Sequence, residues 1–175
     1  MNLWLTGFMG AGKTTTGRRL ARILRLPFAD TDAEVEREHG PIAEIFASDG
    51  ESRFRALESG VIARLAGGAA AVVAVGGGAV VSAENRAAMR ESGSVVHLSI
   101  SAGGAYARVA HRSHRPLLGA TPDLQTIEQV MSGRADAYAE CDFCVTVDGR
   151  NPAAVAHVIA RWHRHRAATR TANTP

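Results

Sequence analysis

The stretch GFMGAGKT, from Gly7 to Thr14, fits the phosphate-loop pattern GxxxxGK[ST] and constrains the fold more than any other part of the chain. The preceding residues, NLWLT, read as a short apolar strand, and TTTGRRLARILR reads as a helix. Glycines within the loop let successive N–H groups and the helix N-terminus face phosphate oxygens. An accidental glycine-rich turn is the alternative, but the flanking strand and helix favour a nucleotide site.

Two side chains at the end of this loop carry the expected chemistry. Lys13 would supply a compact positive charge to the outer phosphates, and the Thr14 hydroxyl suits Mg²⁺, which prefers hard oxygen ligands. The chain has 20 basic residues, of which 19 are arginine and one, Lys13, is lysine. Ammonium and guanidinium are not equivalent in a tight phosphate cradle. The position of the lysine therefore supports the site, although a composition bias could also leave one by chance.

Strand and helix patterns alternate along the whole chain. Strands are expected near residues 2–6, 27–30, 69–75, 94–100 and 143–147. Helices are expected over residues 14–25, 33–46 with an interruption at Gly40-Pro41, 51–67, 82–92, 101–108, 124–138 and 151–165. Five strands alternating with helices predict an α/β protein, a three-layer α/β/α fold with a five-stranded parallel sheet. We expect one domain over residues 1–166 and a disordered basic tail over 167–175.

The charge distribution argues against a nucleic-acid binder. From Asn151 onward there are four arginines and no acidic residue, and the rest of the chain holds 16 basic and 17 acidic residues. No apolar run of about 20 residues suggests a membrane span, and the N-terminus shows no signal-peptide pattern. We expect a cytoplasmic protein without nucleic-acid or membrane partners. Its small size and the lack of a large apolar helix face favour a monomer.

Cys141 and Cys144 form a CxxC pair, which could indicate metal or redox chemistry. A zinc site needs two more ligands, and no second cysteine pair exists. His111 and His114 could supply them, but they lie in a segment expected to be a mobile loop. A thioredoxin-like motif opens a helix, whereas CDFCVTV runs into a strand. Two buried or half-buried thiols are the expectation.

Two carboxylates, Asp30 and Asp32, follow the second expected strand at its carboxyl end. Ligands of open α/β sheets bind outside the carboxyl ends of the strands, and alternation sends both side chains in similar directions. Asp32 could merely cap a helix that begins at Ala33. Beside a phosphate loop, the pair becomes a candidate for contact with a metal-bound water and with a substrate hydroxyl.

Three further features could complete a site. Gly76-Gly77-Gly78 ends a buried strand and could bring backbone N–H groups against a small ligand, or form a flexible turn. Arg55 lies beside an apolar helix stripe, where a solvated side chain is the ordinary outcome. The segment 109–123 is rich in Arg, Gly and Pro and could be a mobile lid or an ordinary loop. No apolar strand ends in the aspartate that phosphate-loop proteins commonly use as a second metal motif.

Taken together, these motifs make the chain resemble the shikimate kinases, a family of small phosphate-loop kinases with a nucleoside-monophosphate-kinase-like fold. The resemblance spans about residues 2–165. It rests on GFMGAGKTT, DTD, IFASDGESRFRALE, VGGGAV, RPLL, RADAY and VDGRNP, in that order. The family also lacks the usual strand-terminal aspartate and uses the DTD carboxylate instead. The resemblance implies ATP-dependent phosphorylation of the 3-hydroxyl of shikimate, a step of chorismate and aromatic amino-acid biosynthesis.

The resemblance also assigns the ATP and magnesium contacts. Those to ATP would come from the phosphate loop, the lid and two adenine-flanking segments, namely Gly10, Ala11, Gly12, Lys13, Thr14, Thr15, Arg108, Arg115, Arg150 and Pro152. Mg²⁺ would be bound by Thr14 and, through water, by Asp30. Arg115, in the lid, would stabilise the transferring phosphoryl group.

The shikimate contacts follow in the same way. Asp32 would bind the ring hydroxyls and orient or deprotonate the attacking one, within a substrate-binding region over about residues 31–60. Arg55 and Arg134 would hold the carboxylate, and the backbone at Gly77 and Gly78 would line the pocket. Lys13, Asp32 and Arg115 are thus the expected catalytic residues. A kinase of another small hydroxy acid such as gluconate, or a non-catalytic nucleotide-binding module, are the alternatives.

Overall fold

The fold is built on one five-stranded sheet. The computed structural model describes residues 1–109 and 123–172. All strand pairs are parallel, and the strand order is β2-β3-β1-β4-β5. The strands are β1 (Asn2–Thr6), β2 (Phe28–Asp30), β3 (Val72–Ala74), β4 (Gly93–Ser99) and β5 (Phe143–Thr146). The sheet has the predicted number of strands and the predicted direction, so the loops after β1, β2 and β3 meet at its carboxyl edge.

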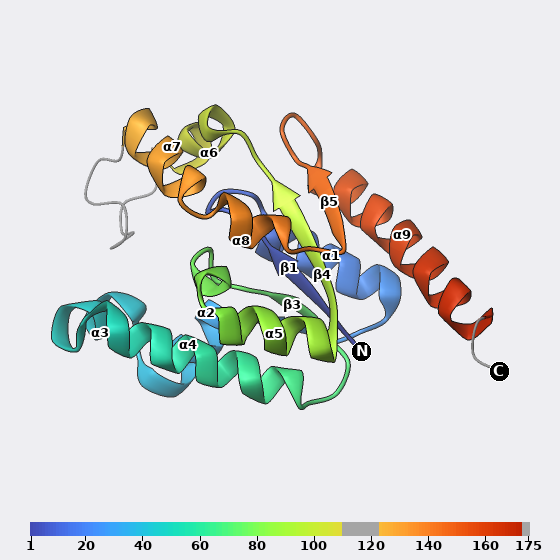
Figure 1. The fold of residues 1–175 in the computed structure, drawn as a ribbon, viewed down its shortest axis with the longest axis horizontal. Helices are drawn as coiled ribbons and strands as arrows, with labels where there is room; N and C mark the ends of the chain where they lie inside the picture. Colours follow the sequence, from blue (N-terminus) through green and yellow to red (C-terminus); the bar gives the residue numbers. More distant parts are fainter. Residues whose placement is uncertain (110–122, 173–175) are drawn as a thin grey trace.

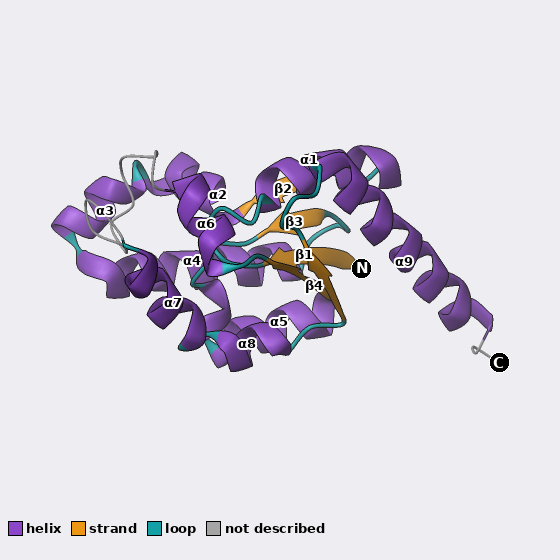
Figure 2. Cartoon of the chain, turned by 90° about the horizontal axis from the view of Figure 1, so that it is seen from above, coloured by secondary structure: helices purple, strands orange, loops and turns teal. Residues whose placement is uncertain are grey.

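Helices cover both faces of the sheet, as the three-layer prediction requires. Figure 2 shows α1 (Lys13–Leu24) and α9 (Pro152–Ala172) on one side, and α4 (Gly50–Ala66), α5 (Ala83–Ser92) and α8 (Ala135–Ala139) on the other. The remaining helices lie beyond the carboxyl ends of the strands (Figure 1): α2 (Thr31–His39), α3 (Ile42–Ser48), α6 (Ala102–Val109) and α7 (Leu124–Ser132). A short 3-10 helix, η1 (Ala79–Val81), follows β3.

The alternating side chains of β1 build the two halves of the core. Leu3 and Leu5 are fully buried and pack with Leu20 of α1 on one face. Trp4 is equally buried and packs with Ile62 of α4 on the other face. A strand buried on both faces is typical of a parallel sheet covered by helices, which explains why the phosphate-loop strand is apolar throughout.

The helices of the predicted substrate-binding region have a small core of their own. Val35 of α2, Ile45 of α3 and Phe54 and Val61 of α4 form a separate buried cluster. Figure 1 shows this group at the end of the molecule opposite α9. The cluster anchors α2 and α3 to α4, so these helices form a wall of the region beyond the sheet.

Two helix boundaries differ from the predicted ones. The segment 124–138 forms α7 and α8 instead of one helix, because the chain turns at Gly133, whose N–H caps α7 on the carbonyl of Gln129. The last helix, predicted to end at His165 before a disordered tail, continues to Ala172. Residues 153–172 contain neither glycine nor proline and include several alanines, so nothing stops the helix. Its end projects past the sheet (Figure 1).

The other differences are smaller. β3 covers only Val72–Ala74, because its pairing with both neighbours is confined to these residues. Most of the predicted lid, residues 110–122, lies outside the described residues, and Val109 ends α6. Asp123 caps α7 by accepting a hydrogen bond of 2.7 Å from the N–H of Thr126. Within the described residues, no helix is long and apolar enough to span a membrane.

Two helical glycines should respond oppositely to alanine. A Cβ at the buried Gly17 of α1 would lie 2.5 Å from the ring of Phe28 and 3.1 Å from Leu5, whereas a Cβ at Gly60 of α4 would meet nothing within 4 Å. We expect Gly17→Ala to lower the free energy of unfolding by about 1–3 kcal/mol through overpacking. Gly60→Ala should raise it by about 0.5–1 kcal/mol through helix propensity.

Chemical denaturation of the two variants and the unsubstituted protein measures both changes. An unaltered or raised stability of Gly17→Ala would contradict the close packing of α1 against β2.

Candidate functional site

The phosphate loop joins β1 to α1 in a conformation that glycine makes possible. Gly7, Gly10 and Gly12 have φ values of 141°, 80° and 84°. Residues with side chains rarely adopt such values. A Cβ at Gly7 would also lie 2.6 Å from the carbonyl oxygen of Leu98 on the neighbouring β4. The loop therefore holds the N-terminus of α1 toward the carboxyl edge of the sheet, where helix N–H groups can face an anion.

Lys13 folds back over this loop. Its Nζ donates hydrogen bonds to the carbonyl oxygens of Gly7, at 2.7 Å, and Phe8, at 3.2 Å. These contacts hold the ammonium group above the N-terminus of α1. A phosphate chain bound by the loop N–H groups would meet the positive charge there.

Thr14 and Asp30 meet across the space between α1 and β2. The Thr14 hydroxyl donates a 2.6 Å hydrogen bond to Oδ2 of Asp30, and Oδ1 of Asp30 accepts a 3.2 Å bond from the N–H of Asp32. Asp30, not Asp32, is therefore the N-cap of α2, which begins at Thr31. Within the described residues there is no cluster of three or more His, Cys, Asp or Glu side chains suited to a metal. One hydroxyl and one carboxylate fit Mg²⁺, which takes few protein ligands and completes its shell with water and phosphate.

The glycine turn Gly76–Gly78, which follows β3, lies against charged side chains. A Cβ at Gly76 would collide with Oε1 of Glu58 and lie 2.8 Å from Oδ1 of Asp32. A Cβ at Gly78 would lie 2.6 Å from a guanidinium nitrogen of Arg55. Only a residue without a side chain permits these approaches. The turn therefore brings its backbone against Asp32 and Arg55 together.

Arg55 is held by two acids of its own helix. Its guanidinium contacts Oε2 of Glu58 at 2.6 Å and Oε1 of Glu51 at 3.1 Å. Glu58 is fully buried, and its Oε1 has no hydrogen-bond partner within the described residues. Burial raises the pKa of Glu58, while the positive charge of Arg55 opposes the rise. The pair fixes the guanidinium at the wall of the pocket.

Arg134 also contacts the glycine turn. It is the N-cap residue of α8, and its Nη1 donates a 3.1 Å hydrogen bond to the carbonyl oxygen of Gly77. The hydroxyl of Tyr138, one helical turn later, donates a 2.6 Å bond to the same oxygen. Arg55 and Arg134, which are 79 positions apart in the sequence, are thus brought to one glycine turn.

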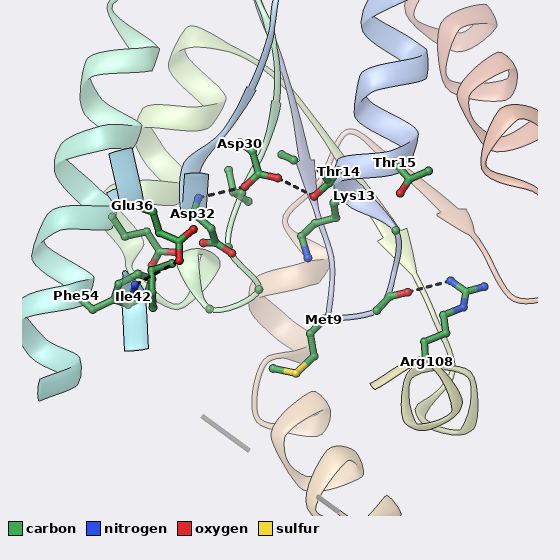
Figure 3. Close-up of a pocket in the computed structure, with 18 of the residues that line it drawn as sticks. Met9, Lys13, Thr14, Thr15, Asp30, Asp32, Glu36, Ile42, Phe54 and Arg108 are labelled. Atoms are coloured by element: carbon green, nitrogen blue, oxygen red, sulfur yellow. Dashed lines mark hydrogen bonds between the residues drawn. The ribbon is translucent and has the colours of Figure 1, made fainter. Parts of the chain in front are cut away.

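The phosphate loop, the two aspartates, the glycine turn and the two arginines line one cleft of about 1000 Å³. Figure 3 shows Lys13, Thr14 and Thr15 toward one end and Asp32, Glu36 and Phe54 toward the other, with Asp30 between them. At the phosphate-loop end, Arg108 of α6 donates a 2.9 Å bond to the carbonyl of Gly10 (Figure 3). Arg150 and Pro152 line the same cleft.

The structure brings nearly all of the predicted site residues to this cleft. The residues that line it include Gly10, Gly12, Lys13, Thr14, Thr15, Asp30, Asp32, Arg55, Gly77, Gly78, Arg108, Arg134, Arg150 and Pro152. Ala11 is buried in the core beneath the loop. Arg115 lies outside the described residues. The phosphate loop lies toward one end of the cleft and Asp32 toward the other, and the roles of the individual residues stay predictions.

Glu58 and Tyr138 were missed as site residues by the sequence reasoning. Glu58 follows Arg55 by three residues, a spacing that places two side chains on the same helix face. Tyr138 follows Arg134 by four residues, which carries the same signal. Neither spacing shows that the side chain reaches the glycine turn, because that contact depends on how α4 and α8 pack against β3.

The two cysteines are free thiols, and one differs from the expectation. Cys141 is half-buried as predicted, but Cys144 is exposed. β5 is an edge strand that pairs only with β4 within the described residues, so an outward-facing position on it stays open. Burial raises the pKa of the Cys141 thiol, which makes it a weaker nucleophile at neutral pH.

Known proteins resemble this chain over most of its length. The model of the family described as "Shikimate kinase" matches residues 9–164. The shikimate kinase of Ruegeria pomeroyi is 44% identical over 146 residues, which cover 83% of this chain and 75% of that protein.

Solved structures agree with the family match. A shikimate kinase from Acinetobacter baumannii, solved in complex with shikimate, superimposes with a TM-score of 0.90 at 34% identity, over 94% of this chain and 93% of that one. A gluconokinase from Sinorhizobium meliloti gives a TM-score of 0.68 at 20% identity, over 99% and 97% of the two chains. The second likeness concerns the fold alone.

His97 of β4, behind the site, should make stability depend on pH. Partial burial, with a smaller contribution from the charge of Lys13, lowers the pKa of His97 from 6.5 to about 4. Above pH 6.5 the His97 imidazole is neutral in both the folded and the unfolded protein. Between about pH 6.5 and 4 it is protonated in the unfolded protein but still neutral in the folded protein. The unsubstituted protein should therefore lose stability in this window, by about 1–3 kcal/mol after allowance for solvent screening.

Denaturation curves from pH 7 to pH 4 for the unsubstituted protein, His97→Gln and the exposed His157→Gln measure this effect. The loss should be smaller only in His97→Gln. An equal loss in all three proteins would show that His97 does not carry it.

Proposed function

The chain belongs to the shikimate kinase family and phosphorylates shikimate, and we propose that it transfers the γ-phosphoryl group of ATP to the 3-hydroxyl group within the cleft described above. The observation that supports this most is that one cleft joins a phosphate loop to a carboxylate and two guanidinium groups at the glycine turn. A small acid with several hydroxyls needs this combination beside a nucleotide.

ATP would lie with its phosphates on the loop and its base toward α6. The N–H groups of Gly10–Thr15 and the ammonium of Lys13 would bind the phosphates. Mg²⁺ would be held by Thr14 and, through water, by Asp30, where it would neutralise charge on the phosphates. Arg108, Arg150 and Pro152 would flank the adenine, since they line that end of the cleft.

Shikimate would lie at the other end of the cleft. Arg55 and Arg134 would bind its carboxylate from two sides, and Gly77 and Gly78 would contribute backbone contacts. Arg55 is already fixed by Glu58 and Glu51, so little rotamer freedom remains to be lost on binding. Asp32 would accept a hydrogen bond from the ring hydroxyls, between the two arginines and the phosphate loop.

The transfer itself would depend on positioning and charge. The hydroxyl oxygen attacks the γ-phosphorus, its proton passes to Asp32, and the bond from the γ-phosphorus to the β–γ bridging oxygen breaks to release ADP. Lys13 stabilises charge on the phosphates during this step. Arg115, expected to act from the lid, lies outside the described residues, and its role stays a prediction. The cytoplasmic location and the monomeric state also stay predictions.

The two alternatives are weaker. A gluconate kinase would share the fold, but its family lacks the combination of GESRFR and RADAY that carries Arg55 and Arg134 here. A non-catalytic nucleotide-binding module would not need Asp32 and both arginines at one glycine turn. Gluconate also carries a carboxylate, so it is the presence of both motifs that favours shikimate as the acceptor.

A coupled ADP-release assay tests the proposed function directly. With ATP and Mg²⁺, ADP release should depend on added shikimate, and gluconate or no acceptor should give only a background rate. Omission of Mg²⁺ should abolish the shikimate-dependent rate. ADP release with gluconate but not with shikimate would refute the proposal.

Arg134→Ala should affect the two substrates unequally. Loss of a charge-assisted contact with the substrate carboxylate should raise the shikimate KM by about 10- to 100-fold and leave the ATP KM within about 2-fold. The matched control is Arg161→Ala, an exposed arginine on α9, which should change neither constant. A larger rise in the ATP KM than in the shikimate KM would place Arg134 on the nucleotide side instead.

A further inference from the structure

Tyr138 is buried beside the glycine turn and has one polar contact that matters to the site. Its hydroxyl donates a 2.6 Å hydrogen bond to the carbonyl oxygen of Gly77, and only 7% of the residue is exposed. Its ring lies on the ring of His97, with centroids 4.7 Å apart. Burial raises the pKa of Tyr138, so the hydroxyl stays protonated and remains a donor at neutral pH.

The carbonyl oxygen of Gly77 accepts two hydrogen bonds, from Tyr138 and from Arg134. Both lone pairs of this oxygen are thus used, and its direction is fixed. No peptide bond of the described chain is cis, and in a trans peptide the carbonyl and the next N–H point in opposite directions. A fixed Gly77 carbonyl therefore also fixes the Gly78 N–H, which points away from the Tyr138 hydroxyl and the Arg134 guanidinium that the carbonyl faces.

The surroundings of α8 explain why this bond matters. The helix covers only Ala135–Ala139, and Arg134 is its N-cap residue. A second pocket, of about 390 Å³, lies beside the ring of Tyr138 and is lined also by His97 and Cys141. The ring packs in the buried cluster behind β3, and the hydroxyl adds a directional contact with Gly77 that the apolar contacts of the ring do not provide.

We propose that Tyr138 is a positioning residue for the acceptor, which fixes the Gly77–Gly78 peptide and, through the shared carbonyl, the guanidinium of Arg134. This inference rests on the proposed function, because it assigns Tyr138 to the shikimate end of the cleft. Tyr138 does not touch the nucleotide end. Its loss should therefore affect the acceptor and leave ATP binding unchanged.

The chain offers a matched pair of variants, because it contains two tyrosines. Tyr106 of α6 is 40% exposed, and Tyr106→Phe removes a hydroxyl far from the glycine turn. Tyr138→Phe should raise the shikimate KM by about 3- to 10-fold, the effect of one lost hydrogen bond. The ATP KM should change by less than about 2-fold, and Tyr106→Phe should match the unsubstituted protein in both constants.

These measurements separate the inference from the proposed function. If the unsubstituted protein and Tyr106→Phe show no shikimate-dependent ADP release, the proposed function fails. If both are active and folded Tyr138→Phe has an unchanged shikimate KM, or equal rises in both KM values, the positioning role is overturned. Thermal unfolding shows whether Tyr138→Phe is folded.

A second measurement keeps the test decisive if Tyr138→Phe does not fold. The Tyr106→Phe protein can be produced with a fluorinated tyrosine, whose phenol is more acidic, so that Tyr138 alone carries the label. Its ionised phenol cannot donate to Gly77, so the shikimate KM should rise with pH between 7 and 9 in the labelled protein only. Absorbance of the labelled phenol follows its ionisation, and a flat KM profile over the pH range in which the phenol ionises, or a parallel rise in the ATP KM, would overturn the inference.

Discussion

The absence of side chains in the Gly76–Gly78 turn is the constraint on which the acceptor end depends. Each glycine lies against different side chains: Gly76 against Glu58 and Asp32, Gly77 against Arg134 and Tyr138, and Gly78 against Arg55. A Cβ at Gly76 or at Gly78 would displace these groups. β3 pairs with the central strand β1, which leads into the phosphate loop, and a Cβ at Gly77 would lie 3.4 Å from the backbone nitrogen of Met9 in that loop, so the turn and the loop lie side by side.

Much of this arrangement could be predicted from the sequence, because its signals are local. The phosphate loop has a fixed pattern, the strands alternate with helices, and Asp30 and Asp32 follow a strand at the edge where ligands bind. The local pattern left Arg55 as an ordinary solvated side chain and gave Arg134 no role, and only the family resemblance assigned either of them. Their meeting at Gly77 and Gly78 depends on tertiary packing across 79 positions of sequence, which no local pattern encodes.

The same distinction explains the errors. Glu58 and Tyr138 were missed because sequence spacing does not show tertiary contacts. Glu58 matters because it is buried beside Arg55, and Tyr138 matters because its hydroxyl reaches the backbone of Gly77. The predicted end of the last helix was wrong because the terminal residues were expected to be disordered, although alanine and arginine form helices well and the helix continues to Ala172. Cys144 was expected to be buried or half-buried, but an edge strand leaves its outer positions exposed.

The two guanidinium groups at the acceptor end are held by different means, with different consequences. Arg55 is fixed by ion pairs with Glu51 and with the fully buried Glu58, all on the long helix α4. Arg134 precedes a helix of five residues and is held by one backbone carbonyl that it shares with Tyr138. Arg55 is therefore set in place when α4 folds, whereas the position of Arg134 follows the orientation of a single peptide group. Under the proposed function, a residue that turns this peptide would act on acceptor binding without touching the acceptor.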